Sequence, residues 1–194
     1  MEYGPGGLAV LYAEENTRDA LFAAMQRREA YATSGTRPVL RFFGGWDYPE
    51  NSCEAADMVA RGYAGGVPMG GDLSAPGADD RAPRFIISAL ADSGTADYPG
   101  NPLQRIQLIK GWYEEGELKE SVLDVAGGDN NASVDLNTCE ASGSGHAQLC
   151  RVWQDNDFNP DAQAFYYTRV LENPSCRWSQ RLCVDAGVRC ENPG

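Results

Sequence analysis

The chain has 194 residues, of which 42% are hydrophobic, and its 16 basic and 28 acidic side chains give a net charge of −12. This length is enough for one domain or for a small piece joined to a second domain, and the hydrophobic share is enough for a core. The negative charge repels phosphate backbones and anionic lipid surfaces, so we expect neither nucleic acid nor a membrane among the partners.

Two features of the sequence bear on the compartment of the protein. The stretch MEYGPGGLAV at the start lacks the basic segment and the long apolar segment of a signal peptide. The chain nevertheless has six cysteines and no Cys-x-x-Cys pair, which argues against a zinc ribbon and for disulfides. Because disulfides form in exported proteins, we expect the true start of the protein to lie upstream of Met1.

The first predicted elements are a strand, a helix and two further strands, with the strands at 8–12, 31–34 and 39–43. Asn16 or Thr17 can cap the helix, and Asp19 lies near its positive N-terminus. Apolar residues at helical spacing in ALFAAM form one stripe along this helix. Since one strand–helix–strand unit cannot bury both faces of its sheet, we expect it to need neighbours.

Residues 45–82 are rich in glycine and proline, as in GYAGGVPMGGDLSAPGADD. This composition favours turns, so we predict an irregular linker here. The linker divides the chain into residues 1–44, residues 45–82 and residues 83–194.

From residue 83 onward, apolar and polar residues alternate as they do in β-strands. Phe85, Ile87 and Ala89, for example, share one face of the first of these strands. The predicted strands are PRFIISALA, LQRIQLIKGWY, SVLDVA, HAQLCRVW and AFYYTRVLE. Short strands separated by turns indicate a β-sandwich-like domain, so the fold class is α+β and mainly β.

Polar side chains around the second predicted strand are the first candidates for a functional site. Arg28 and Arg37 flank Thr33-Ser34-Gly35, whose hydroxyl and backbone N–H groups could join them in binding an anion such as phosphate. Arginines at a helix end also satisfy carbonyl groups, which is the structural alternative. Glu14, after the first strand, could face an active site at the end of a barrel strand or could serve only the helix cap.

A second candidate is the loop DNNASVDLNTCE, residues 129–140, which has oxygen-bearing side chains at the ligand positions of a calcium loop. These side chains are Asp129, Asn131, Ser133, Asp135, Asn137 and Glu140. Val134 stands where the sharp turn of an EF-hand needs glycine, and neither flanking helix is predicted, so ordinary turn chemistry is the alternative. The single histidine, His146, lies in a Gly/Ser-rich loop and is expected to be exposed rather than catalytic.

Among the cysteines, Cys139 and Cys150 enclose a loop of ten residues and are the pair that we predict. Six cysteines allow fifteen full pairings, so the other pairings stay open.

Four motifs, in order along nearly the whole chain, carry a family resemblance. They are AEENTRDALFAAMQRREAYATSGTRPVLRFFGGW, GYAGGVPMGGDL, PLQRIQLIKGW and FYYTRVLENPSCRWS. Through them the chain resembles the late segment of an uncharacterised family, domain of unknown function 3604. That family in turn resembles metal-dependent hydrolases of the PHP (polymerase and histidinol phosphatase) type, which bind metal ions in a distorted (β/α) barrel through His-x-His and Asp-x-His motifs.

Neither of those metal-binding motifs occurs in this chain. The resemblance therefore implies the C-terminal portion of an exported, periplasmic or secreted hydrolase, with phosphoesters as one candidate substrate class. It implies no metal in this portion and Zn, Mn or Fe in the full-length parent. Residues 8–43 would be the last strand and helix of the barrel and the strand that leaves it, and residues 83–190 an appended β-sandwich that packs against the missing barrel.

On this interpretation Glu14, Arg28, Ser34 and Arg37 would lie on the substrate side of the parent's active site. The alternative is a non-catalytic binding or structural β-sandwich, with a carbohydrate, a protein or calcium as its ligand. Trp112, Trp153 or Trp178 would then contact a ligand if exposed, although tryptophans are more often buried.

Overall fold

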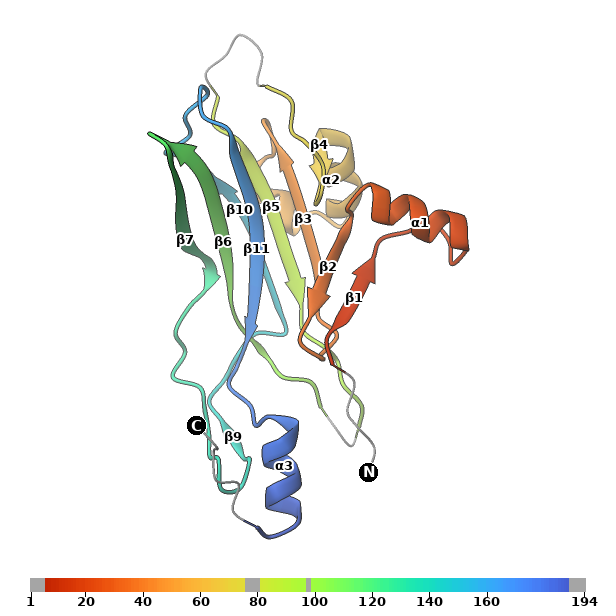
Figure 1. Ribbon diagram of the computed structural model, residues 1–194, viewed down its shortest axis with the longest axis vertical. Coiled ribbons are helices and arrows are strands. Elements are labelled where there is room, and N and C mark those ends of the chain that lie inside the picture. Colours follow the sequence, from red (N-terminus) through yellow and green to blue (C-terminus); the bar gives the residue numbers. More distant parts are fainter. Residues whose placement is uncertain (1–5, 76–80, 97–98, 189–194) are drawn as a thin grey trace.

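The computed structural model describes residues 6–75, 81–96 and 99–188, and most of it consists of two β-sheets that lie face to face (Figure 1). The first sheet has the spatial order β10-β5-β3-β4 and consists of β3 (Val39–Gly45), β4 (Gly66–Pro68), β5 (Arg84–Leu90) and β10 (Gln148–Gln154). The second has the order β11-β6-β7 and consists of β6 (Leu103–Glu114), β7 (Glu117–Gly127) and β11 (Ala164–Glu172). All neighbouring strands in both sheets are antiparallel. The prediction of a mainly β fold is confirmed.

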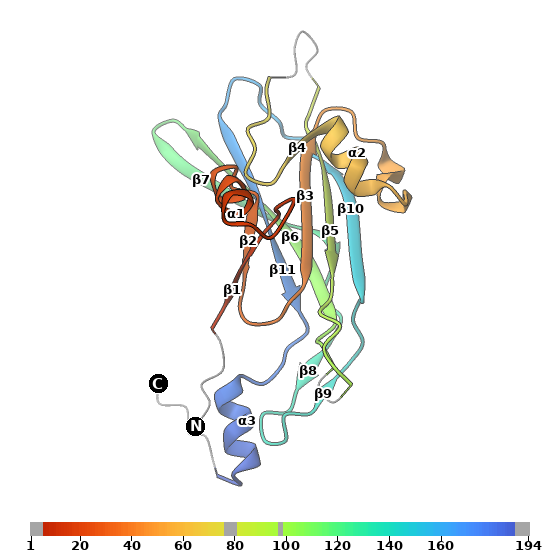
Figure 2. The same ribbon diagram turned by 90° about the vertical axis from the view of Figure 1, so that its right-hand side faces the viewer.

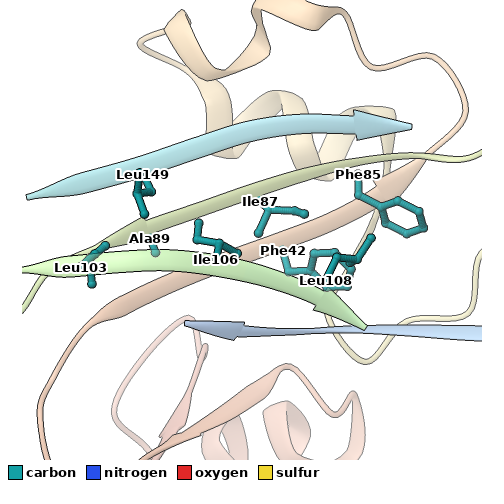
Figure 3. Close-up of a cluster of buried hydrophobic side chains, with 8 residues drawn as sticks. All are labelled: Phe42, Phe85, Ile87, Ala89, Leu103, Ile106, Leu108 and Leu149. Carbon is teal, nitrogen blue, oxygen red and sulfur yellow. The ribbon is translucent and has the colours of Figure 1, made fainter. Parts of the chain in front are cut away.

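The core lies between the inner faces of the two sheets, as Figure 3 shows. Phe85, Ile87 and Ala89 of β5 point toward Ile106 and Leu108 of β6, and all five side chains are buried. The prediction that Phe85, Ile87 and Ala89 share one face of β5 is therefore confirmed. Burial of each large apolar side chain contributes about 1.5–3 kcal/mol relative to its exposure, so this layer holds the sheets together.

The outer face of the first sheet is covered as well, which explains why Ile86 is as buried as Ile87. Two short elements, η1 (Glu50–Glu54) and α2 (Met58–Gly65), lie on this face (Figure 2). Met58 and Val59 pack against a second cluster that contains Phe43, Tyr48 and Ile86. Residues 45–82 thus contain a helix and a strand where we predicted an irregular linker.

The glycines of this segment are the reason for that difference. A Cβ atom at Gly62 would lie 2.5 Å from the ring of Phe43, so only glycine lets α2 approach β3 this closely. Glycine in a helix usually costs stability and signals a turn in a sequence, but here close packing of the helix requires it. The segment therefore belongs to the core, and β3 lies between β4 and β5 in one continuous sheet.

Residues 8–33 form an arm that extends beside the sandwich (Figures 1 and 2). It consists of β1 (Leu8–Leu11), α1 (Arg18–Gln26) and β2 (Ala30–Thr33), as the sequence predicted. The hydroxyl of Thr17 caps α1 by accepting a hydrogen bond from the backbone N–H of Ala20 at 3.3 Å. β1 and β2 pair antiparallel in a sheet of their own, whereas consecutive strands of a (β/α) barrel run parallel.

At the lower end of the molecule in Figure 1 are α3 (Trp178–Asp185) and a small hairpin of β8 (Ser133–Val134) and β9 (Ala141–Ser142). A disulfide between Cys139 and Cys176 joins this hairpin to the segment before α3, and a second, between Cys53 and Cys150, joins η1 to β10. The predicted Cys139–Cys150 pair is therefore wrong. Cys150 lies within β10, where η1 comes close enough for a Cα–Cα distance of 5.8 Å, and a short loop in sequence could not reveal that contact.

Cys183 is disulfide-bonded too, and none of the cysteines in the described residues is free. Helices long and apolar enough to cross a membrane do not occur in the part of the chain that the structure describes.

The two disulfides with both cysteines described differ in the loops that they close, 97 against 37 residues apart in sequence. By loop-closure entropy, a Cys53→Ala/Cys150→Ala variant should lose about 4–5 kcal/mol of unfolding free energy, and a Cys139→Ala/Cys176→Ala variant about 1 kcal/mol less. Urea unfolding of both variants measures the difference. An equal or larger loss in the second variant would contradict loop length as the cause.

Candidate functional site

Hydrogen bonds from two tyrosines attach the arm to the edge of the first sheet. Tyr12 donates to the carbonyl of Leu40 at 2.6 Å, and Tyr31 donates to the carbonyl of Pro38 at 2.8 Å. The guanidinium of Arg41 lies 3.5 Å from the centre of the Tyr12 ring, a cation–π contact. Burial raises the pKa of Tyr12, so this hydroxyl stays a donor at all ordinary pH values.

A buried carboxylate strengthens this attachment at the end of α1. Glu29 is only 4% exposed, and it accepts a hydrogen bond from the hydroxyl of Tyr63 on α2. Tyr63 in turn accepts one from Arg41 at 3.3 Å, and Arg27 lies 3.5 Å from the Glu29 carboxylate. Buried polar groups of this kind are costly unless paired, so the network sets the position of β2 relative to β3.

A cavity of about 540 Å³ lies between the arm and the second sheet, and we name it the Glu172 cavity. Its walls come from β2, the β2–β3 turn, β3 and β11. One end is polar and is lined by Thr33, Ser34, Thr36, Thr168 and Glu172, and the other is mostly apolar and is lined by Leu40, Phe42, Met69 and Tyr166. This size and this mixture are typical of small-molecule sites.

The carboxyl group of Glu172 is the main polar feature of this cavity. Its Oε2 atom accepts a hydrogen bond from the hydroxyl of Thr36 at 3.1 Å, while its Oε1 atom is buried and has no hydrogen-bond partner among the residues that the structure describes. Burial raises the pKa of Glu172, and the charge of nearby Asp92 raises it further. A buried carboxyl oxygen without a partner costs free energy, which adds to the cost of ionising Glu172.

Asp92 keeps its negative charge because backbone groups hydrogen-bond to it. The N–H of Gly94 donates to its Oδ1 at 2.8 Å and that of Arg37 to its Oδ2 at 2.9 Å, and these bonds lower the pKa of Asp92. Asp92 therefore adds a negative charge near Glu172, while the positive charge of Arg37 acts on Asp92 as well.

A second cavity of about 750 Å³, here the aromatic cavity, shares Phe42, Met69, Gly70 and Tyr166 with the first. Trp46 and Phe158 also line it, with ring centroids 5.7 Å apart. It has fewer polar groups, and the Arg28–Asp72 ion pair, at 3.2 Å, belongs to its lining.

Tyr166, which lines both cavities, is held by a buried ion pair. Its hydroxyl donates to Asp155 Oδ2 at 2.5 Å, and Lys110 Nζ lies 2.6 Å from the same oxygen. Lys110 also donates to the carbonyl of Asp157 at 3.0 Å. Burial raises the pKa of Tyr166, and its bond to the Asp155 carboxylate raises it further. This bond and a ring contact with Phe85 of β5, at 4.5 Å between centroids, hold the Tyr166 side chain in place.

The structure separates the residues that the sequence grouped into one site. Ser34 lines the Glu172 cavity, and Arg28 lines the aromatic cavity, where it pairs with Asp72. Arg37 has an exposed side chain and contributes its backbone N–H to Asp92, and Glu14 is exposed in the β1–α1 turn. Sequence reasoning missed Glu172 altogether, because one glutamate at the end of a strand carries no signal of burial.

The proposed calcium loop forms the β8–β9 hairpin, and its polar side chains are engaged in turns. The carboxylate of Asp129 accepts from the backbone of Asn131, and that of Asp135 accepts from Asn137. Within the described residues no group of three or more His, Cys, Asp or Glu side chains is placed to hold a metal ion. His146 is exposed, and its backbone pairs with Leu103.

A comparison with protein families matches one family over residues 1–193, the one described as "Protein of unknown function (DUF3604)". The chain belongs to this family. The match covers nearly the whole chain and so confirms the resemblance to this family that the four sequence motifs indicate. No curated protein and no solved structure matched the chain.

In this DUF3604 chain the Lys110–Asp155 pair should matter far more than a surface pair. Lys110→Met leaves the buried Asp155 carboxylate without its cation, so we expect a loss of about 3–5 kcal/mol in unfolding free energy. Lys119→Met removes the exposed partner of Glu114 and should change the unfolding free energy far less, because water and salt screen an exposed pair. Urea unfolding of the two variants checks this, and equal losses would contradict it.

Glu172→Gln should stabilise the chain at neutral pH, because it removes a carboxylate that the folded state disfavours and keeps an acceptor for Thr36. The folded-state pKa is raised, so the penalty exists above that pKa and disappears as the pH falls through it toward 4.5. The melting temperature should rise by about 2–4 °C at pH 7 for each kcal/mol relieved, with little gain at low pH. The exposed Glu120→Gln is the control, and a loss of stability at pH 7 in Glu172→Gln would refute the penalty.

Proposed function

We propose that the chain is a non-catalytic, C-terminal portion of an exported metal-dependent hydrolase, with phosphoesters as a candidate substrate class. The resemblance of its family to PHP-type hydrolases supports this assignment. In such a parent, Zn, Mn or Fe would be bound by a preceding barrel that carries the His-x-His and Asp-x-His motifs, neither of which occurs in this chain. Disulfides support a periplasmic or secreted location, because they persist in oxidising compartments.

The observation that carries this proposal is the apolar surface of the arm. Phe22 is 59% exposed and Met25 is 56% exposed on α1, which extends away from both sheets (Figure 1). In the described part of the chain, β1 pairs only with β2, so its other edge is open. Exposed apolar side chains beside an open strand edge mark a surface that another polypeptide segment covers.

The occupant that we propose is the barrel of the same parent protein, and the arm would be the segment that connects it to the sandwich. Glu14, at the β1–α1 turn, would lie nearest to the barrel and would be the first candidate for a contact with substrate. Arg28, Ser34 and Arg37 remain candidates for contacts near the substrate of the parent protein. They lie before and after β2 and do not form one cluster in this chain.

The test compares this chain with the protein extended upstream in its reading frame, which should encode His-x-His and Asp-x-His. With Mn²⁺ or Zn²⁺, the extended protein should hydrolyse p-nitrophenyl phosphate and this chain should not. Phe22→Ser/Met25→Ser should separate barrel from sandwich in the extended protein, measured as faster proteolysis of the arm. Leu118→Ser, which alters a 74% exposed side chain at the β6–β7 hairpin, should have no such effect. Hydrolysis by this chain alone would refute the proposal.

A second candidate function is a binding module, and the Glu172 cavity favours it. The cavity is half polar, has a buried carboxyl oxygen without a partner, and lies between elements that the Tyr12 and Glu29 contacts hold in place. A carbohydrate, a protein segment or calcium were the ligands expected from the sequence. We place the candidate binding site in this cavity and not in the loop at 129–140.

A further inference from the structure

The charge of the Glu172 cavity follows from the alternation of side chains along β11. Tyr166, Thr168 and Val170 are partly buried, whereas Phe165, Tyr167 and Arg169 are exposed on the opposite face. Arg169 donates to Gln107 on that outer face at 3.4 Å. Although Arg169 contributes to the lining, its guanidinium therefore points away from Glu172, and within the described ranges the structure shows no ion pair to this carboxyl group.

The other groups at the polar end do not neutralise Glu172 either. Thr36 supplies one hydroxyl to Oε2, and the remaining side chains there are the hydroxyls of Thr33, Ser34 and Thr168. Asp92, close by, adds negative charge, because its hydrogen bonds favour the ionised form. A ligand that brings a positive charge into the cavity would offset the charge of the Glu172 carboxylate.

The opposite end of the cavity suits an apolar body. Phe42 and Tyr166 are aromatic and Leu40 and Met69 aliphatic, and the buried Lys110–Asp155 pair fixes the Tyr166 ring. Aromatic faces also attract cations that lie within about 6 Å of the ring centre. A molecule with a cationic head and an apolar tail can therefore place each part against matching side chains.

We propose that the Glu172 cavity binds a small organic cation, a primary ammonium or guanidinium group on an apolar body, with Glu172 as its counter-ion. This inference rests on the second candidate function, that the sandwich is a binding module, and does not depend on the hydrolase assignment. Thr33 and Ser34 accept hydrogen bonds from the cationic head, and Phe42, Met69 and Tyr166 contact the apolar part.

The experiment uses the whole chain and a matched pair of probes, phenethylammonium and the neutral phenethyl alcohol, followed by amide chemical shifts in NMR titrations. A ligand this small should bind with a Kd of about 1 mM. Shifts should concentrate at Thr33, Thr36, Thr168 and Glu172, and the alcohol should bind at least about tenfold more weakly, the usual margin of a charge-assisted hydrogen bond.

Two variants test the role of the carboxylate. Glu172→Gln should weaken ammonium binding at least about tenfold while the fold remains, because it is expected to stabilise the chain at pH 7. Glu120→Gln makes the same charge change at an exposed position on β7 and should leave binding unchanged, which controls for general attraction to the charge of −12.

Three outcomes would contradict the proposal. If the alcohol binds as tightly as the ammonium, the cavity binds ligands but the proposed class is wrong. If neither probe shifts the signals around Glu172 at concentrations up to about ten times the expected Kd, both the inference and the binding module are refuted. If Glu120→Gln weakens binding as much as Glu172→Gln, the attraction is nonspecific and the site is refuted.

Discussion

Burial of the central strands on both faces is the constraint on which the rest of this structure depends. Ile86 and Ile87 are adjacent in β5 and point to opposite sides of the sheet, yet neither has any exposed surface. An antiparallel sheet usually leaves one face to water, so a second covering layer is required. The chain supplies the β6–β7–β11 sheet on one side and α2 with η1 on the other. Gly62 and the Cys53–Cys150 disulfide keep that second layer close.

The same arrangement leaves one side of the sandwich less filled than the other. β10 lies near β6 and β7 and closes one edge between the sheets, whereas both cavities lie along the edge formed by β3, β4 and β11. The arm covers part of this edge, and its anchors at Tyr12, Tyr31 and Glu29 are hydrogen bonds rather than a packed core. A space with rigid walls and polar groups is therefore retained where a fully packed sandwich would have none.

In the described residues, the sandwich has a large buried core, whereas the arm consists of one helix and a two-stranded sheet. The sandwich has a buried apolar core, and its buried charges at Lys110 and Asp155 are paired, but its second sheet also exposes apolar side chains such as Leu118 and Phe165. The arm exposes Phe22 and Met25 and has an open strand edge at β1.

The sequence by itself determined the family, the strands after residue 83, the cap of α1 and the face of β5 that forms the core. These features depend on local patterns, namely alternation, capping hydroxyls and long motifs, which survive without knowledge of distant contacts. Tertiary structure decided the rest. Gly62 is typical of a turn in the sequence, but in the fold it lets α2 pack against Phe43. Cys150 pairs with Cys53 because η1 covers β10. The Glu172 carboxyl group is partly buried because the fold brings Thr36 and Asp92 next to it. Each of these depends on a residue far away in the chain, and spacing along the sequence carries no information about such encounters.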